Sequence, residues 1–130
     1  MTLSSKLAGA LLLMAPLFVM SAQAQGLQAV RPLSGYKCMA LNLSEQQMMT
    51  ETVPMLAQPS AGAPKVGIVA ATVIAAESPP VNGYQKVLRL DGKVGWVSSQ
   101  YLKPWVNPGS SGQKCVPSLM SNGRLGYAYQ

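Results

Sequence analysis

The sequence predicts a small all-β domain, and three observations support this fold class. The segment 65–76, KVGIVAATVIAA, is rich in β-branched side chains and is too short and too poorly capped for a helix. Asp91 and Gly92 separate two apolar runs, an arrangement typical of a tight β-hairpin. Loops rich in Gly, Pro and Ser divide the rest of the chain into short segments.

The first 24 residues have the pattern of a cleavable secretory signal peptide. Lys6 supplies a positive charge, an apolar run follows over 7–20, and the small residues Ala22 and Ala24 precede the expected cleavage point. The run is shorter than the roughly 20 apolar residues that span a bilayer. An uncleaved membrane anchor is the alternative, but the small residues favour cleavage. We therefore expect a periplasmic or secreted product.

The charge of the mature chain favours some partners and disfavours others. Of ten Lys and Arg residues, Lys6 leaves with the signal peptide, and nine minus four acidic residues leaves a net charge of +5. These basic residues are scattered singly, whereas a nucleic-acid-binding protein usually clusters them. We expect no nucleic-acid partner. The charge suits either simple solubility or an anionic envelope surface or acidic partner.

Cys38 and Cys115 are the two cysteines of the chain. In an oxidising compartment an even pair predicts one disulfide. Closing so long a loop contributes about 4–5 kcal/mol in the chain-entropy model. A redox-active pair usually has two residues between its cysteines. We therefore predict a structural disulfide.

The segment 25–52 is predicted to be an N-terminal arm that contains a short helix. Ser44 followed by Gln47 forms a capping-box pattern for a helix that continues to about Glu51. Pro54 prevents any continuation.

The segment 53–105 is predicted to be a run of short strands. Its clearest element is a hairpin over 84–97, with a two-residue loop at the Asp-Gly pair. That loop length places Val87 opposite Trp96 and Leu88 opposite Gly95. A 3-10-like turn at 98–102 then precedes a last strand that ends near a proline.

The tail, 106–130, is rich in Gly, Ser, Asn and Pro, and its segment 121–124 has the composition of a turn. The pattern S-G-x-K-C occurs at 34–38 and again at 111–115. This repetition suggests two flanking arms that the disulfide ties together, although a coincidence over five residues is the alternative.

The strand-rich block contains a series of short motifs, namely Gln58-Pro59-Ser60, Lys65-Val66-Gly67-Ile68-Val69, Thr72-Val73-Ile74, Gly83-Tyr84-Gln85-Lys86-Val87, Asp91-Gly92-Lys93-Val94-Gly95-Trp96-Val97 and Tyr101-Leu102. In these motifs the block resembles the bacterial SH3-like domain, the exported relative of the Src-homology-3 barrel. The resemblance implies a small SH3-like barrel over 53–105, flanked by arms at 25–52 and 106–130. The chain departs from the family's pattern at Pro54-Met55-Leu56, at Ala71-Thr72 and at Tyr84, which replaces the usual tryptophan.

The residue types disfavour catalysis. The chain has no histidine, which excludes histidine general bases, Ser-His-Asp triads and most zinc sites. Its four acids lie in separate segments, so a catalytic carboxylate pair is not expected. Thioether ligands for cuprous ion are conceivable, but adaptable packing is the favoured role of Met39, Met48, Met49 and Met55. We expect no enzyme activity, no metal and no cofactor.

Aromatic residues are the candidate ligand-binding set. The resemblance implies a groove that binds extended peptides across aromatic faces. Tyr84, Tyr101 and Trp105 are the expected ligand-binding residues, whereas Trp96 is expected in the core. We therefore predict a monomeric, non-catalytic module that binds a peptide, a peptidoglycan stem or an envelope protein. The alternatives are a structural or accessory envelope protein whose arms cover the groove, and an inhibitor of an envelope hydrolase.

Overall fold

The computed structural model describes residues 26–130, which form ten β-strands, one α-helix and one short 3-10 helix. The all-β prediction is confirmed. The predicted signal peptide, 1–24, lies outside the described residues. Neither helix in the described part has the length and apolar character that crossing a membrane requires.

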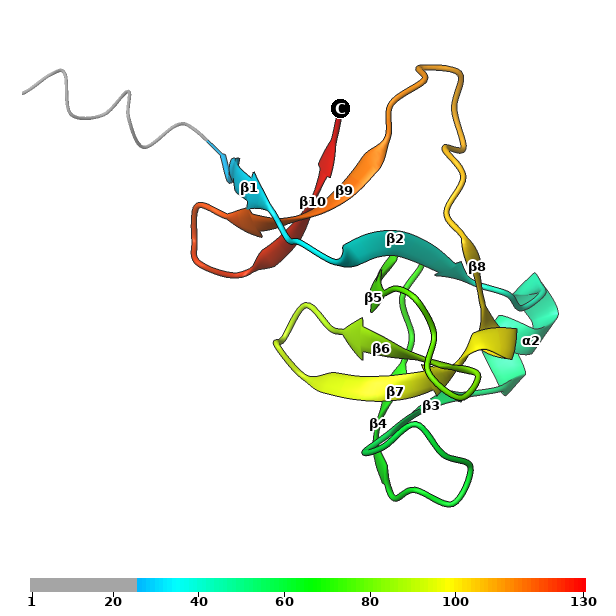
Figure 1. Cartoon of the computed structure of the whole chain (residues 1–130). Helices are drawn as coiled ribbons and strands as arrows, with labels where there is room; N and C mark the ends of the chain where they lie inside the picture. Colours follow the sequence, from blue (N-terminus) through cyan, green and yellow to red (C-terminus); the bar gives the residue numbers. More distant parts are fainter. Residues whose placement is uncertain (1–25) are drawn as a thin grey trace, which may run out of the picture.

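Two antiparallel sheets make up the fold (Figure 1). The smaller sheet has the order β1-β9-β10 and contains β1 (Ala29–Pro32), β9 (Cys115–Met120) and β10 (Leu125–Tyr129). The larger sheet has the order β4-β3-β7-β6-β5-β2-β8. Its strands are β2 (Tyr36–Leu41), β3 (Val53–Leu56), β4 (Lys65–Val69), β5 (Ile74–Glu77), β6 (Tyr84–Leu88), β7 (Val94–Ser98) and β8 (Leu102–Pro104). Within residues 26–130 neither sheet closes into a barrel, since β4 and β8 remain edge strands.

The flanking segments contribute more strands than their composition suggests. β2 comes from the segment expected to be an N-terminal arm, yet it lies inside the larger sheet between β5 and β8. Its Cys38, Met39 and Leu41 are buried, which accounts for its interior position. The polar tail likewise forms β9 and β10 around the turn predicted at 121–124, and β9 also pairs with β1.

The short helix α2 (Glu45–Thr50) begins where the capping pattern predicts. The Ser44 hydroxyl accepts a hydrogen bond from the Gln47 backbone N–H at 3.1 Å. In return the Gln47 side-chain oxygen accepts the Ser44 backbone N–H at 2.9 Å. This reciprocal pair satisfies N–H groups at the helix start and so defines where the helix begins.

The β6–β7 hairpin forms, but its register differs by one residue from the prediction. Val87 lies opposite Gly95, and Trp96 lies opposite Lys86. The cause is a three-residue loop rather than a two-residue one, because Gly92 donates to the Arg89 carbonyl at 2.9 Å and adopts φ +89°. One residue of shift exchanges the faces of the second strand. The prediction that Trp96 lies in the core is therefore wrong, because Trp96 is half-buried on the outer face.

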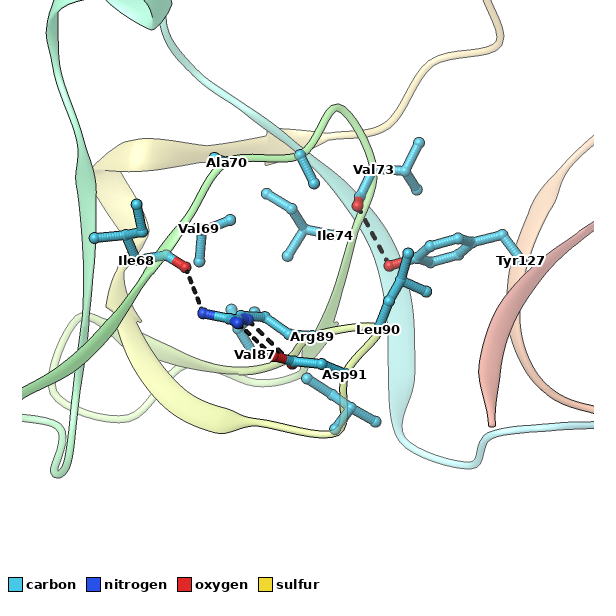
Figure 2. A pocket seen from close by; sticks show the side chains of 12 residues that line it. Ile68, Val69, Ala70, Val73, Ile74, Val87, Arg89, Leu90, Asp91 and Tyr127 are labelled. Atoms are coloured by element: carbon cyan, nitrogen blue, oxygen red, sulfur yellow. Dashed lines mark hydrogen bonds and ion pairs between the residues drawn. The ribbon is translucent and has the colours of Figure 1, made fainter. Parts of the chain in front are cut away.

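A disulfide and a side-chain hydrogen bond are among the contacts that join the sheets. Cys38 of β2 and Cys115 of β9 form the predicted disulfide, with their Cα atoms 6.0 Å apart. From β10, the Tyr127 hydroxyl donates a hydrogen bond to the Val73 carbonyl, at 3.3 Å, just before β5 (Figure 2). The smaller sheet is thus attached to the β2–β5 region of the larger one.

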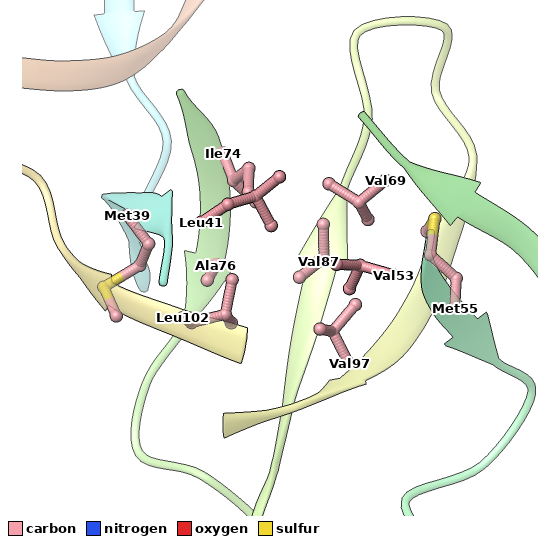
Figure 3. Packing of buried hydrophobic residues seen from close by; sticks show 10 residues of the cluster. All are labelled: Met39, Leu41, Val53, Met55, Val69, Ile74, Ala76, Val87, Val97 and Leu102. Atoms are coloured by element: carbon pink, nitrogen blue, oxygen red, sulfur yellow. The ribbon is translucent and has the colours of Figure 1, made fainter. Parts of the chain in front are cut away.

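The core lies on the inner face of the larger sheet, and each of its seven strands contributes to it (Figure 3). The buried cluster comprises Met39, Leu41, Val53, Met55, Val69, Ile74, Ala76, Val87, Val97 and Leu102. Gly95 also faces this side, because a Cβ atom built on it would lie 2.9 Å from the Cβ of Met55. The absence of a side chain at Gly95 is therefore what allows Met55 to be fully buried against β7.

Replacing Gly95 with alanine should destabilise the fold. The added methyl group would be too close to Met55 Cβ and to the Leu56 carbonyl at 3.3 Å, and such overpacking costs about 1–3 kcal/mol. Denaturant unfolding, followed by circular dichroism, measures the loss. Gly62→Ala is the matched control, because no atom lies within 4 Å of its added Cβ. Equal stability of the two variants would contradict this account of Gly95.

Removing the disulfide should lower stability much more. Cys38→Ser combined with Cys115→Ser releases a loop that spans 77 positions, and the chain-entropy model then gives a loss of about 4–5 kcal/mol. The measurement is the unfolding free energy of this double variant beside that of the oxidised parent protein. An unchanged denaturation midpoint would show that the bond does not constrain the unfolded chain.

Candidate functional site

The three predicted ligand-binding aromatic residues occupy different places. Tyr84 begins β6, opposite Ser98, and is half-buried. Tyr101 ends the 3-10 helix η2 (Ser99–Tyr101) and packs partly against the core. Trp105 follows β8 and lines a cleft to which neither of these tyrosines contributes. The structure therefore does not bring the three side chains together in this cleft.

Trp105 is paired instead with a tyrosine from the tail. Its ring centroid lies 5.8 Å from that of Tyr129, and the two planes are tilted by 44°. This separation is within the range of favourable aromatic pairs. Trp105 is half-buried, whereas Tyr129 keeps 47% of its surface exposed. The two rings thus form one partly accessible aromatic surface between the segment after β8 and the end of β10.

The cleft beside these rings has a volume of about 610 Å³. Apolar groups line much of it, together with Lys103 and the polar side chains of Asn107 and Gln113. Asn107 organises the adjoining loop, because its amide nitrogen donates to the Gln113 carbonyl at 2.9 Å and its oxygen accepts the Gly109 N–H at 2.8 Å. Lys103 has no acidic partner within residues 26–130. The cleft therefore combines aromatic faces with an available ammonium group.

A second cavity, of about 390 Å³, opens between the 70–73 loop and the tip of the β6–β7 hairpin (Figure 2). Its wall reaches core residues, among them Val69, Ile74 and Val87. Arg89 and Asp91 lie on it and form an ion pair, and Arg89 Nη1 also donates to the Ile68 carbonyl at 3.1 Å. The charged groups of this cavity thus largely satisfy each other.

Two pKa values near the cavity are shifted by their surroundings. The pKa of Asp91 lies below its usual 3.8, mainly because its carboxylate accepts hydrogen bonds from the Arg89 side chain and then from the Lys93 backbone N–H. Burial raises the pKa of Tyr127 above its usual 10.0. The Tyr127 hydroxyl therefore stays protonated at neutral pH and can keep donating to the Val73 carbonyl.

Tyr127 and Tyr129 are the functional candidates that sequence reasoning missed. Both appear in the sequence as flanking aromatic residues, at alternate positions of LGYAY. That alternation was the available signal, because residues two apart in a strand share a face. It becomes informative only once the tail is known to be a strand beside the larger sheet.

The site offers binding groups rather than a metal-binding arrangement. Within residues 26–130, no three acidic or cysteine side chains gather where they could hold a metal ion. Comparison of the chain with models of known protein families, with curated proteins and with solved structures found no match. The geometry of the clefts is therefore the basis for assigning a function.

The titration of Asp91 should depend on Arg89. A lowered pKa in the folded state means that the pair stabilises the fold above the pKa of the unfolded chain, and that this contribution disappears as the pH falls through the folded value. NMR titration of the Asp91 carboxyl group should give a pKa below 3.8, and Arg89→Gln should raise it toward 3.8. Lys86→Gln, with the lysine opposite Trp96, is the control and should leave the Asp91 pKa unchanged.

Proposed function

We propose that this protein is an exported, non-catalytic binding module of the cell envelope, which holds an extended peptide segment against the Trp105–Tyr129 surface. The observation that carries this proposal is the tilted ring pair beside a cleft of about 610 Å³. Aromatic rings provide large contact areas with little loss of side-chain freedom on binding. Peptide binding along such faces is a recurring mode of recognition.

The exposure of the rings favours binding over the structural alternative. If the tail served only to cover a groove, Tyr129 would be expected to be buried against Trp105. Tyr129 keeps 47% of its surface exposed instead, and the cleft beside it is lined from both sheets. The tail thus contributes one wall of the cleft, which supports a binding module with two-sided contact to its ligand.

Three features support the envelope assignment. The segment 1–24 has signal-peptide composition, the Cys38–Cys115 bond suits an oxidising compartment, and the strand-rich block resembles the exported SH3-like domain. The larger sheet, curled around one core, is compatible with a divergent and open version of that barrel. We therefore assign the module to the periplasm or the cell exterior.

The lining of the cleft indicates the class of ligand. Lys103 can pair with a carboxylate, while the rings can contact an apolar side chain or the flat faces of peptide groups. Peptide segments of envelope proteins and the stem peptides of peptidoglycan both combine these groups. The two sources are separated by testing them individually.

Trp105→Ala should abolish most ligand retention. The parent protein is incubated separately with purified sacculi and with chemically defined envelope peptides, and the bound fraction is measured. Loss of a central aromatic contact typically weakens binding by about 2 kcal/mol or more, which is roughly thirtyfold in Kd. Lys103→Glu should weaken binding too, because it reverses the charge beside the rings.

Tyr84→Ala is the matched control for this experiment, since Tyr84 is a half-buried aromatic residue away from the cleft. It should bind like the parent protein, and the thermal midpoint of each variant shows whether folding is intact. Retention on neither material, or equal retention by parent, Trp105→Ala and Lys103→Glu proteins, would disprove the proposal.

A further inference from the structure

Strand β10 has a free edge, because it is the outermost strand of the smaller sheet. The N–H and C=O groups of Gln130 bond to Lys114, at 2.9 and 2.7 Å. Bonded and non-bonded pairs alternate along an antiparallel ladder, so even-numbered residues of β10 bond toward β9. The N–H and C=O groups of Leu125, Tyr127 and Tyr129 consequently point away from β9, toward the outer edge of β10. Within residues 26–130 these outward groups have no hydrogen-bond partner.

The other three sheet edges are protected against pairing. Proteins block exposed edges with proline, with charged side chains and with very short strands. β1 contains Arg31 and Pro32, and β8 has three residues that end at Pro104. On β4, the Ile68 carbonyl already accepts a hydrogen bond from Arg89. The sequence of β10, LGYAY, has neither charge nor proline, so it alone among these edges is open to another strand.

Three clefts lie side by side along β10. Leu125, Tyr127 and Tyr129 share one face of β10, spaced about 7 Å apart. Leu125 lines a leucine-rich cleft of about 600 Å³, Tyr127 lines the cavity of about 390 Å³, and Tyr129 lines the cleft of about 610 Å³. A strand paired with β10 would place every second side chain on this face, about 5 Å from these residues. Its alternate side chains would therefore meet the clefts in succession.

The charged side chains that line this row of three clefts favour an acidic partner. Lys103 lines the cleft at one end and Arg124 lines the cleft at the other. The acid in this row, Asp91, is already paired with Arg89, and no other ion pair occurs in residues 26–130. A second copy that pairs β10 to β10 in antiparallel fashion would bring its Lys103 end to the Arg124 end. Like charges would then face each other, which disfavours a dimer through this edge.

We propose that β10 binds a partner protein segment as a fourth strand of the smaller sheet. The segment carries acidic residues near its two ends and apolar residues at every second position between them. Its backbone pairs with the outward groups of Leu125, Tyr127 and Tyr129, and its apolar side chains enter the three clefts. This inference rests on the proposed function, because the Trp105–Tyr129 cleft is one of the three.

Amide hydrogen exchange tests the pairing residue by residue. In the free protein, the amides of Leu125, Tyr127 and Tyr129 should exchange rapidly, whereas those of Gly126 and Ala128 should be protected. The probe is the tightest binder from a phage-displayed library of random peptides selected on the purified protein. At saturation with this peptide, the three odd-numbered amides should become at least about tenfold slower, because each gains a hydrogen bond.

N-methylation of the same peptide gives an independent readout. Methyl groups on amides that face β10 should weaken binding about tenfold each, and methyl groups on the alternating amides should leave Kd nearly unchanged. Selected sequences should also show apolar residues at a period of two, and Glu or Asp near both ends. Trp105→Ala is measured in parallel to report on the proposed function by itself.

The outcomes separate the two proposals. If binding depends on Trp105 while the odd-numbered amides stay rapid and N-methylation has no alternating effect, strand addition is wrong and the proposed function stands. If binding is insensitive to Trp105→Ala but protects those amides, the edge binds a strand and the aromatic cleft is not the site. Protection that appears in the free protein as its concentration rises would identify a second copy as the occupant and overturn the proposal. So would failure of every selected peptide to protect the three amides.

Discussion

The disulfide between Cys38 and Cys115 is the constraint on which the arrangement of the two sheets depends. It joins β2, an interior strand of the larger sheet, to the first residue of β9 in the smaller one. Cys115 lies directly opposite Tyr129 in the β9–β10 ladder, so fixing this cysteine also places the tyrosine. The covalent link therefore helps to hold Tyr129 close to Trp105. The position of the aromatic surface is thus linked to this bond, which an oxidising compartment preserves.

The features that follow from local rules were predictable from the sequence. The capping box at Ser44, the turn near Gly92 and the even pair of cysteines each depend on a few neighbouring residues or on a simple count. The hairpin register was not predictable, because it depended on whether the loop had two residues or three. That single residue decided that Trp96 lies on the outer face and Gly95 on the inner one.

The candidate site was only partly predictable, for a related reason. Aromatic residues are visible in any sequence, but which of them meet depends on strand pairing over long distances. Trp105 was identified, whereas Tyr127 and Tyr129 gained their roles from a smaller sheet that the polar composition of the tail concealed. Tyr84 and Tyr101 occupy positions of the family pattern, but the structure places both outside the Trp105 cleft. Strand pairing between distant segments thus limited how far both the fold and the candidate site could be predicted from the sequence.

The pairing of β1 with β9 also has a kinetic consequence. Ala29 lies opposite Met120, so this ladder joins segments from nearly opposite ends of the described chain, whereas the larger sheet is complete once Pro104 has been made. Contacts between residues so distant in sequence form slowly. The β1–β9 pairing is therefore expected to form after the β9–β10 hairpin, which is local. Until it forms, the smaller sheet has a second unpaired edge at which aggregation competes with assembly, and oxidation of the cysteines shortens this interval by holding β9 near its final position.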